Sequence, residues 1–103
     1  MKDEVSEAVL LIGAEIDFNA IYGRFALTSV GRADAFDHAV NEALDQIGRF
    51  PFSAPTHEDC FRRLMLGGYS LALYYVIEGR RVFVHAILDS RQSPEAIRRR
   101  LGL

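Results

Sequence analysis

The pattern that most constrains this fold is a three-stranded meander followed by a capped helix, spread over residues 61–103. Short apolar segments there are separated by Gly67-Gly68, which is typical of a two-residue hairpin turn, and by a second turn at 78–80. Ser93-Pro94-Glu95 has the hydroxyl, proline and acid that favour a helix start. We expect strands at 61–66, 69–77 and 81–88, and a helix at 94–101.

The second strand of this meander is apolar at nearly every position between Tyr69 and Ile77. A strand that alternates polar and apolar residues has one wet face, whereas this one predicts burial on both faces. We therefore expect it at the centre of the sheet.

The first half of the chain is predicted to begin with a strand at 5–12, near an edge of the sheet, followed by two helices at 14–25 and 32–47. The helices share a short connection and should form an antiparallel hairpin, with Gly48 ending the second in the left-handed conformation. Residues 50–59 contain two prolines and are expected to form a loop. The apolar positions recur at helical spacing and should pack on the sheet: Phe18, Ile21, Phe25, Phe36, Val40, Leu44 and Ile47.

This order, β-α-α-β-β-β-α, predicts an α+β fold in which the helical hairpin packs on a mostly antiparallel four-stranded sheet. At 103 residues the chain is expected to form one domain, residues 1–103, with a core that needs neither disulfide nor metal. The single cysteine fits a reducing compartment, and no apolar run reaches the roughly 18 residues needed to span a bilayer. We expect a cytoplasmic protein with no membrane partner.

Charge is distributed unevenly along the chain. Residues 1–60 hold four basic and eleven acidic residues, a net charge of −7, whereas residues 61–103 hold eight basic and three acidic residues, a net charge of +5. A basic half that is rich in strands suggests a specific acidic partner, either a protein or a nucleic acid.

The order of these segments resembles the RelE/ParE toxin superfamily of type II toxin–antitoxin systems. The residues that carry the resemblance are a basic strand, an aromatic strand, a hydrophobic strand that closes before a helix, and an A-x-x-D helix opening. In this chain they are Arg62-Arg63-Leu64, Leu73-Tyr74-Tyr75-Val76, Leu88-Asp89-Ser90-Arg91-Gln92-Ser93-Pro94 and Ala14-Glu15-Ile16-Asp17.

The resemblance implies a toxin that a cognate acidic antitoxin neutralises in a hetero-oligomer, as in plasmid-stabilisation systems. ParE-like members inhibit DNA gyrase, and RelE-like members cut messenger RNA on the ribosome. The ParE-like function is the leading interpretation. The alternatives are a ribosome-dependent mRNA endonuclease and a degenerate member that only binds antitoxin.

RNA cleavage needs a base, an acid and cations near the reacting phosphate. The candidates are Arg62 and Arg91 as cations and Tyr74 or His85 for proton transfer. On a regular third strand His85 would share a face with Phe83 and Ile87, so a packed histidine is the simpler interpretation. Where many relatives carry a histidine this chain has Asp89, and its net charge of −2 disfavours ribosomal RNA. We therefore expect no nuclease chemistry.

Antitoxin or target binding has its own candidates, each with a structural alternative. Arg62 and Arg63 are adjacent on a strand and must point to opposite faces. Tyr75 fits sheet packing as well as partner contact, and basic residues at the end of the last helix also complement its dipole. The full set is Arg62, Arg63, Tyr75, Arg91, Arg98, Arg99 and Arg100. Neither a metal site nor a cofactor is expected from the spacing of histidine, cysteine and glycine.

Overall fold

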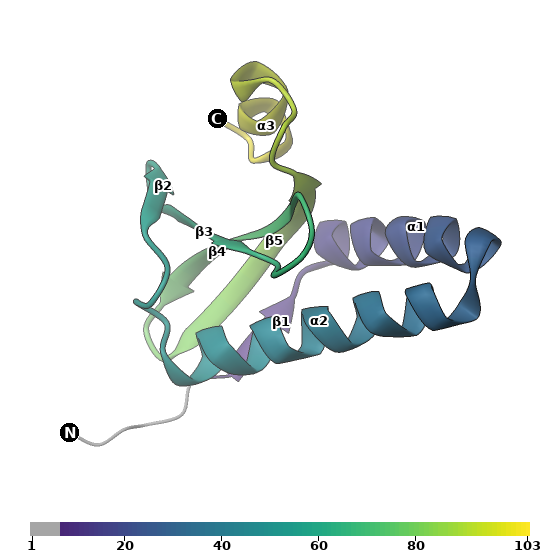
Figure 1. Cartoon of the computed structure of the whole chain (residues 1–103). Helices are drawn as coiled ribbons and strands as arrows, with labels where there is room; N and C mark the ends of the chain where they lie inside the picture. The colour runs from purple at the N-terminus through teal and green to yellow at the C-terminus, as the bar shows by residue number, and fades with distance from the viewer. Residues whose placement is uncertain (1–6) are drawn as a thin grey trace.

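The computed structural model describes residues 7–103. It has eight elements, arranged as a central sheet with helices on both faces (Figure 1). The elements in chain order are β1 (Glu7–Leu10), α1 (Ile12–Thr28), α2 (Val30–Arg49), β2 (Thr56–Glu58), β3 (Phe61–Met65), β4 (Leu71–Glu78), β5 (Arg81–Asp89) and α3 (Pro94–Arg100).

The strands form one sheet in the order β1-β5-β4-β3-β2. Strand β1 lies at an edge, as predicted, and pairs in parallel with β5, whereas the other neighbouring strands pair antiparallel. The predicted start of β1 at Val5 lies outside the described residues. The α+β class is thus confirmed, and the element order matches the prediction apart from one additional strand.

The prediction of four strands was wrong, because a fifth strand lies inside the expected loop at 50–59. Strand β2 pairs Thr56 with Arg62 and Glu58 with Phe61. The chain turns between β2 and β3 through Asp59, whose φ of 55° is in the left-handed region. A three-residue strand with a histidine and an acid has no alternating pattern, so its pairing with β3 is what defines it.

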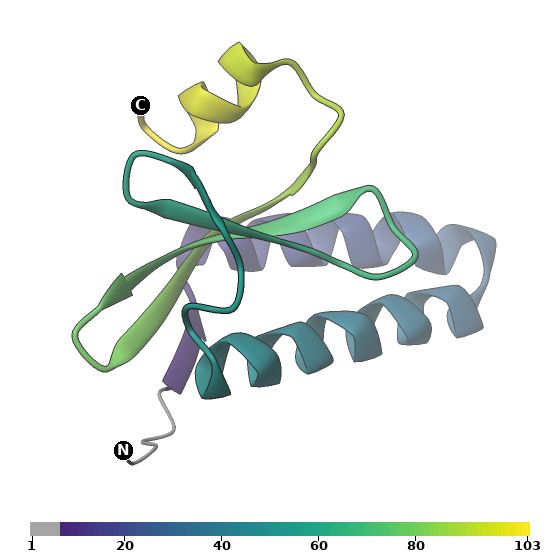
Figure 2. The same ribbon diagram turned by 60° about the vertical axis from the view of Figure 1, so that its left-hand side comes forward.

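Helices α1 and α2 lie side by side on one face of the sheet (Figures 1 and 2). Only Ser29 separates them, and its hydroxyl caps α2 by accepting a hydrogen bond from the Arg32 N–H. The seven apolar positions predicted to pack on the sheet do so: Ile21, Phe36, Val40 and Ile47 are buried, and Phe18, Phe25 and Leu44 are partly buried against the same core.

Two glycine predictions were wrong. Gly48 lies inside α2, which continues to Arg49 and ends at Phe50, so this glycine does not adopt the left-handed conformation. Gly67-Gly68 belongs to a wider loop, because the last strand pair is Met65 with Ala72, and only Gly68 has a positive φ, of 83°.

Strand β4 is covered on both faces, as its composition predicted. Leu73 and Tyr75 belong to the core beneath α1 and α2, whereas Ala72, Tyr74 and Val76 belong to a second core. Ile97 and Leu101 of the C-terminal segment cover this second core. Helix α3 begins as predicted, with the Ser93 hydroxyl accepting from the Ala96 N–H at 3.2 Å.

A register shift places His85 in a bulge of β5. Tyr74 pairs with Ala86, but Tyr75 pairs with Val84, so His85 is an extra residue. The prediction that His85 shares a face with Ile87 was therefore wrong, because Ile87 packs in the core under α1 and α2. The His85 ring instead meets Phe61 of the second core edge to face, with centroids 5.1 Å apart.

Candidate partner-binding groove

A hollow lined by two arginines lies between the helical hairpin and the open end of β4 and β5. One cavity of about 340 Å³ lies between the end of α1 and the β3–β4 loop. A second, of about 230 Å³, continues toward α3 and shares Ile21, Arg24, Leu71 and Asp89 with the first. We call the two together the hairpin groove.

The floor of the hairpin groove is apolar. Ile21 and Phe25 come from α1 and Leu71 from β4. Tyr69 is fixed against the helices by edge-to-face contacts with Phe25 at 5.9 Å and Phe36 at 6.0 Å between centroids. Side chains held in this way present a preformed surface for an apolar group of a ligand.

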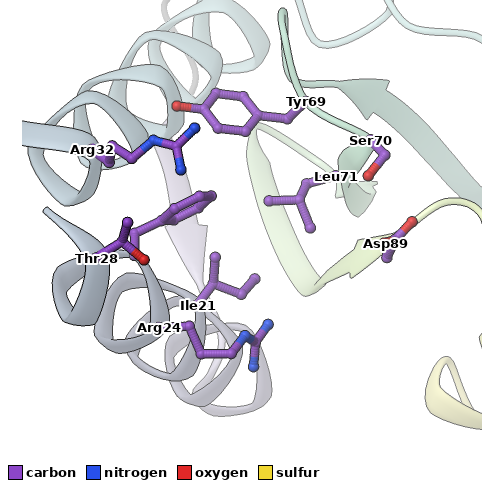
Figure 3. Close-up of a pocket in the computed structure, with 9 residues that line it drawn as sticks. Ile21, Arg24, Thr28, Arg32, Tyr69, Ser70, Leu71 and Asp89 are labelled. Atoms are coloured by element: carbon purple, nitrogen blue, oxygen red, sulfur yellow. The ribbon is translucent and has the colours of Figure 1, made fainter.

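Two arginines form the helical wall of the hairpin groove. Arg24 lies on α1 and Arg32 in the first turn of α2, and Figure 3 shows both guanidinium groups opposite Tyr69, Ser70 and Asp89. Neither arginine makes an ion pair with any residue in 7–103. Two cations without counter-ions beside an apolar floor suit a ligand that combines a carboxylate or phosphate with an apolar group.

The two acids that line the hairpin groove already have partners. Asp89 accepts from Arg91 through the backbone N–H at 2.9 Å, Nε at 3.0 Å and Nη2 at 2.8 Å. These hydrogen bonds lower the pKa of Asp89 to about 2. Asp17 accepts from Arg100 at 2.8 Å and from the Ile87 N–H at 3.0 Å.

Sequence reasoning did not nominate Arg24 or Arg32. A signal was present, because they are two of the four basic residues in the acidic half of the chain and flank the turn of the helical hairpin. Two basic residues that flank a tight helical turn are brought close together by the antiparallel packing.

The residues nominated for RNA cleavage are not brought together. Arg62 lies on the helical side of the sheet, where it donates to the Ala54 carbonyl at 2.6 Å. Tyr74 and His85 lie on the side of the second core, and Arg91 is tied to Asp89 in the turn after β5. The Tyr74 hydroxyl is buried and has no hydrogen-bond partner in the described part of the chain.

The residues nominated for partner binding are also dispersed. Tyr75 is fully buried and offers no surface to a partner. Arg98 pairs with Glu58 of β2, and Arg100 pairs with Asp17, so two basic residues of α3 anchor the helix to the rest of the molecule. Arg99 is exposed and makes no ion pair within residues 7–103.

Arg63 lies on the opposite face from Arg62, as predicted from their adjacency. It pairs with Tyr74 across the strands and lies near His57, whose ring meets Tyr74 edge to face at 5.5 Å. Burial, and then the charge of Arg63, lower the pKa of His57. This corner has a cation and an imidazole, and Glu58, the neighbour of His57 in β2, is held in an ion pair with Arg98 of α3.

Sequence comparison finds no protein-family model and no curated protein that matches the chain. Structural comparison finds a chain of the chromosomal ParDE TA system from P. aeruginosa, with a TM-score of 0.58 and 17% sequence identity. The match covers 81% of this chain and 94% of that chain. The likeness shows that the two share a fold, which is the fold expected from the resemblance to the RelE/ParE superfamily. None of the helices in residues 7–103 is long and apolar enough to cross a membrane.

Proposed function

We propose that this protein is a ParE-like toxin of a type II toxin–antitoxin pair. It acts in the cytoplasm by binding DNA gyrase, and a cognate acidic antitoxin neutralises it. The likeness to a chain of the ParDE TA system supports the fold on which this proposal depends. Because one fold hosts several functions, the site must carry the rest of the argument.

The observation that carries the proposal is the hairpin groove, with Arg24 and Arg32 beside a floor of Ile21, Phe25 and Leu71. An antitoxin segment that places an apolar side chain on this floor and a carboxylate beside the two arginines would match both its shape and its charge. Arginine and aromatic anchors typically dominate the affinity of such interfaces.

The RelE-like alternative requires an acid, a base and cations at one place. Here Arg62 lies on the helical side of the sheet, whereas Tyr74 and His85 lie on the other side. This separation favours a toxin that acts by binding. A degenerate member that only binds antitoxin would share the hairpin groove and lack the activity on gyrase.

Antitoxin binding is tested by co-expression with the product of the reading frame immediately upstream, which the proposal expects to be short and acidic. Arg24→Glu with Arg32→Glu should slow association and flatten its salt dependence, because two steering charges are reversed. The matched control is Arg99→Glu, which reverses an exposed arginine of α3 and should change association little. Unchanged association for the first variant and slow association for the control would place the antitoxin on α3 instead.

The target is tested separately. Expression should induce the SOS response while cellular mRNA stays intact, and purified protein should inhibit supercoiling by gyrase. Cleavage of mRNA on translating ribosomes, without an effect on gyrase, would favour the RelE-like alternative. Tight binding to antitoxin with neither effect would indicate the degenerate member.

A further inference from the structure

The segment between α2 and β2 presents two aromatic rings to solvent. We call residues 50–55 (Phe50, Pro51, Phe52, Ser53, Ala54 and Pro55) the aromatic loop. The side chains of Phe50 and Phe52 are 62% and 71% exposed, the highest values among the aromatic residues of the described chain. Exposed rings add nothing to the core, so the folding of this chain does not account for them.

Side chains of β3 and β4 hold the aromatic loop in one shape. The Tyr75 hydroxyl donates to the Pro51 carbonyl at 2.7 Å, and Arg62 donates to the Ala54 carbonyl at 2.6 Å. The Arg62 guanidinium also lies under the Phe52 ring, 4.9 Å from its centroid. Arg62, which sequence reasoning nominated for catalysis or binding, therefore positions an aromatic side chain.

The start of the aromatic loop is fixed to α2. The Phe50 N–H donates to the Gln46 carbonyl at 2.7 Å, and the Ser53 N–H donates to the Phe50 carbonyl at 3.0 Å. Rings held in place before binding lose less conformational entropy when a partner covers them. The aromatic loop thus has the property expected of an anchor that enters a pocket.

The surroundings of the aromatic loop distinguish between classes of partner. Arg49 pairs with Asp45 at 3.2 Å, and Arg62 is engaged with the Ala54 carbonyl, so among residues 7–103 the two arginines nearest the aromatic loop are not free to bind phosphates. Gln46 and Ser53 provide a neutral polar rim. An apolar centre with a polar rim is the usual anatomy of a protein–protein interface, and protruding rings fit a concave apolar pocket on the partner.

The aromatic loop is remote from the hairpin groove. Arg32 lies in the first turn of α2 and Phe50 caps its C-terminal end, and Figures 1 and 2 place the hairpin turn and this end at opposite ends of the helix. Eighteen residues of helix correspond to about 27 Å. Binding at one site can therefore be changed without touching the other.

We propose that the aromatic loop is the target-binding element of this protein, which inserts Phe50 and Phe52 into an apolar pocket of a folded protein partner. The inference rests on the proposed function, in which that partner is DNA gyrase. It names the surface that would contact gyrase, the aromatic loop, and the kind of contact, aromatic rings in an apolar pocket. It also assigns target binding and antitoxin binding to two different surfaces of the protein.

The test compares two double variants that remove exposed apolar groups. Phe50→Ser with Phe52→Ser alters the aromatic loop, and Leu27→Ser with Val30→Ser alters the hairpin turn, where the side chains are 89% and 69% exposed. Purified gyrase is the probe, and circular dichroism checks folding. The aromatic loop variant should lose at least about 30-fold in gyrase affinity, as expected for removed anchors, and keep its affinity for antitoxin. The Leu27→Ser, Val30→Ser variant should keep its affinity for both gyrase and antitoxin.

A third variant tests positioning without removing a ring. Tyr75→Phe deletes the hydrogen bond to Pro51 and leaves both phenylalanines in place. It should weaken gyrase binding, with a larger unfavourable entropy by calorimetry, because the aromatic loop must then be ordered on binding. Calorimetry identical to the wild type would overturn the positioning role.

The outcomes separate this inference from the proposed function. Wild-type protein that binds antitoxin but not gyrase would overturn both the target and this inference. Wild-type binding to gyrase that survives loss of both phenylalanines would overturn this inference alone. Loss of single-stranded RNA binding, or of self-association, in the Phe50 and Phe52 variant without loss of gyrase binding would assign the rings to base stacking or to a second copy of the chain.

Discussion

Tyr74 and Tyr75 are adjacent in β4 and both fully buried, yet only the Tyr75 hydroxyl has a hydrogen-bond partner among residues 7–103. Tyr75 points toward α1 and α2 and donates to the Pro51 carbonyl at 2.7 Å. Tyr74 points into the second core, where its hydroxyl has no partner among residues 7–103. The strand pleat sends the two side chains to opposite faces of the sheet. The Tyr75 hydroxyl therefore stabilises the fold, whereas burial of the unpaired Tyr74 hydroxyl destabilises it.

The two tyrosine-to-phenylalanine variants should therefore change stability in opposite directions. Tyr74→Phe removes a buried, unsatisfied hydroxyl and should raise the free energy of unfolding by about 1 kcal/mol. Tyr75→Phe leaves the Pro51 carbonyl without its donor and should lower that free energy by about 1–2 kcal/mol. Chemical denaturation of both variants measures the difference. A loss for Tyr74→Phe equal to that for Tyr75→Phe would contradict the assignment.

Asp17 should be the acid whose loss most weakens the attachment of α3. Its carboxylate accepts from the Ile87 N–H and from Arg100, and so joins α1 to β5 and α3. Asp17→Asn should lower the free energy of unfolding by about 1–3 kcal/mol, because charge-assisted hydrogen bonds are lost. Hydrogen exchange should accelerate first in α3. Glu15→Gln, an exposed neighbour outside any ion pair in the described chain, should stay within about 0.5 kcal/mol of the wild type.

Asp89 should give the protein an acid-sensitive contribution to stability. Its pKa is lowered to about 2 by the hydrogen bonds from Arg91. A depressed carboxyl pKa contributes stability that is fully present above the unfolded pKa, near 4, and is lost as the pH falls toward the folded value of about 2. NMR titration of the Asp89 carboxyl measures this pKa, and Asp89→Asn should remove this part of the pH dependence. A midpoint at the ordinary aspartate value would contradict the Arg91 contact in solution.

His85 should be dispensable for toxicity. Its ring packs on Phe61 in the β5 bulge and makes no side-chain hydrogen bond or ion pair within residues 7–103. His85→Gln should leave growth arrest largely intact, whereas loss of a general acid or base typically lowers a rate by about 10²–10⁴-fold. Arg91→Ala removes a second residue nominated for RNA cleavage and should likewise leave growth arrest largely intact. Codon-specific cleavage of mRNA that either variant abolishes while remaining folded would support a nuclease.

The sequence alone determined the elements whose signal is local. Helical spacing of apolar residues predicted the hairpin of α1 and α2, and Ser93-Pro94-Glu95 predicted the start of α3. The unbroken apolar run of β4 predicted a strand covered on both faces. Each of these signals lies within one segment and does not depend on which strand becomes its neighbour.

Only the tertiary structure decided the features that depend on pairing between distant segments. Strand β2 exists because Thr56 and Glu58 find partners in β3, and the bulge at His85 exists because β4 and β5 shift register there. The sheet neighbours of Arg62 made it a support for the aromatic loop, and the close packing of α1 on α2 brought Arg24 and Arg32 to one groove. Spacing along the chain can place two residues beside one turn, as it does Arg24 and Arg32, but it does not decide which cavity they line or which strands pair, because those contacts are set by how separate apolar faces are buried together.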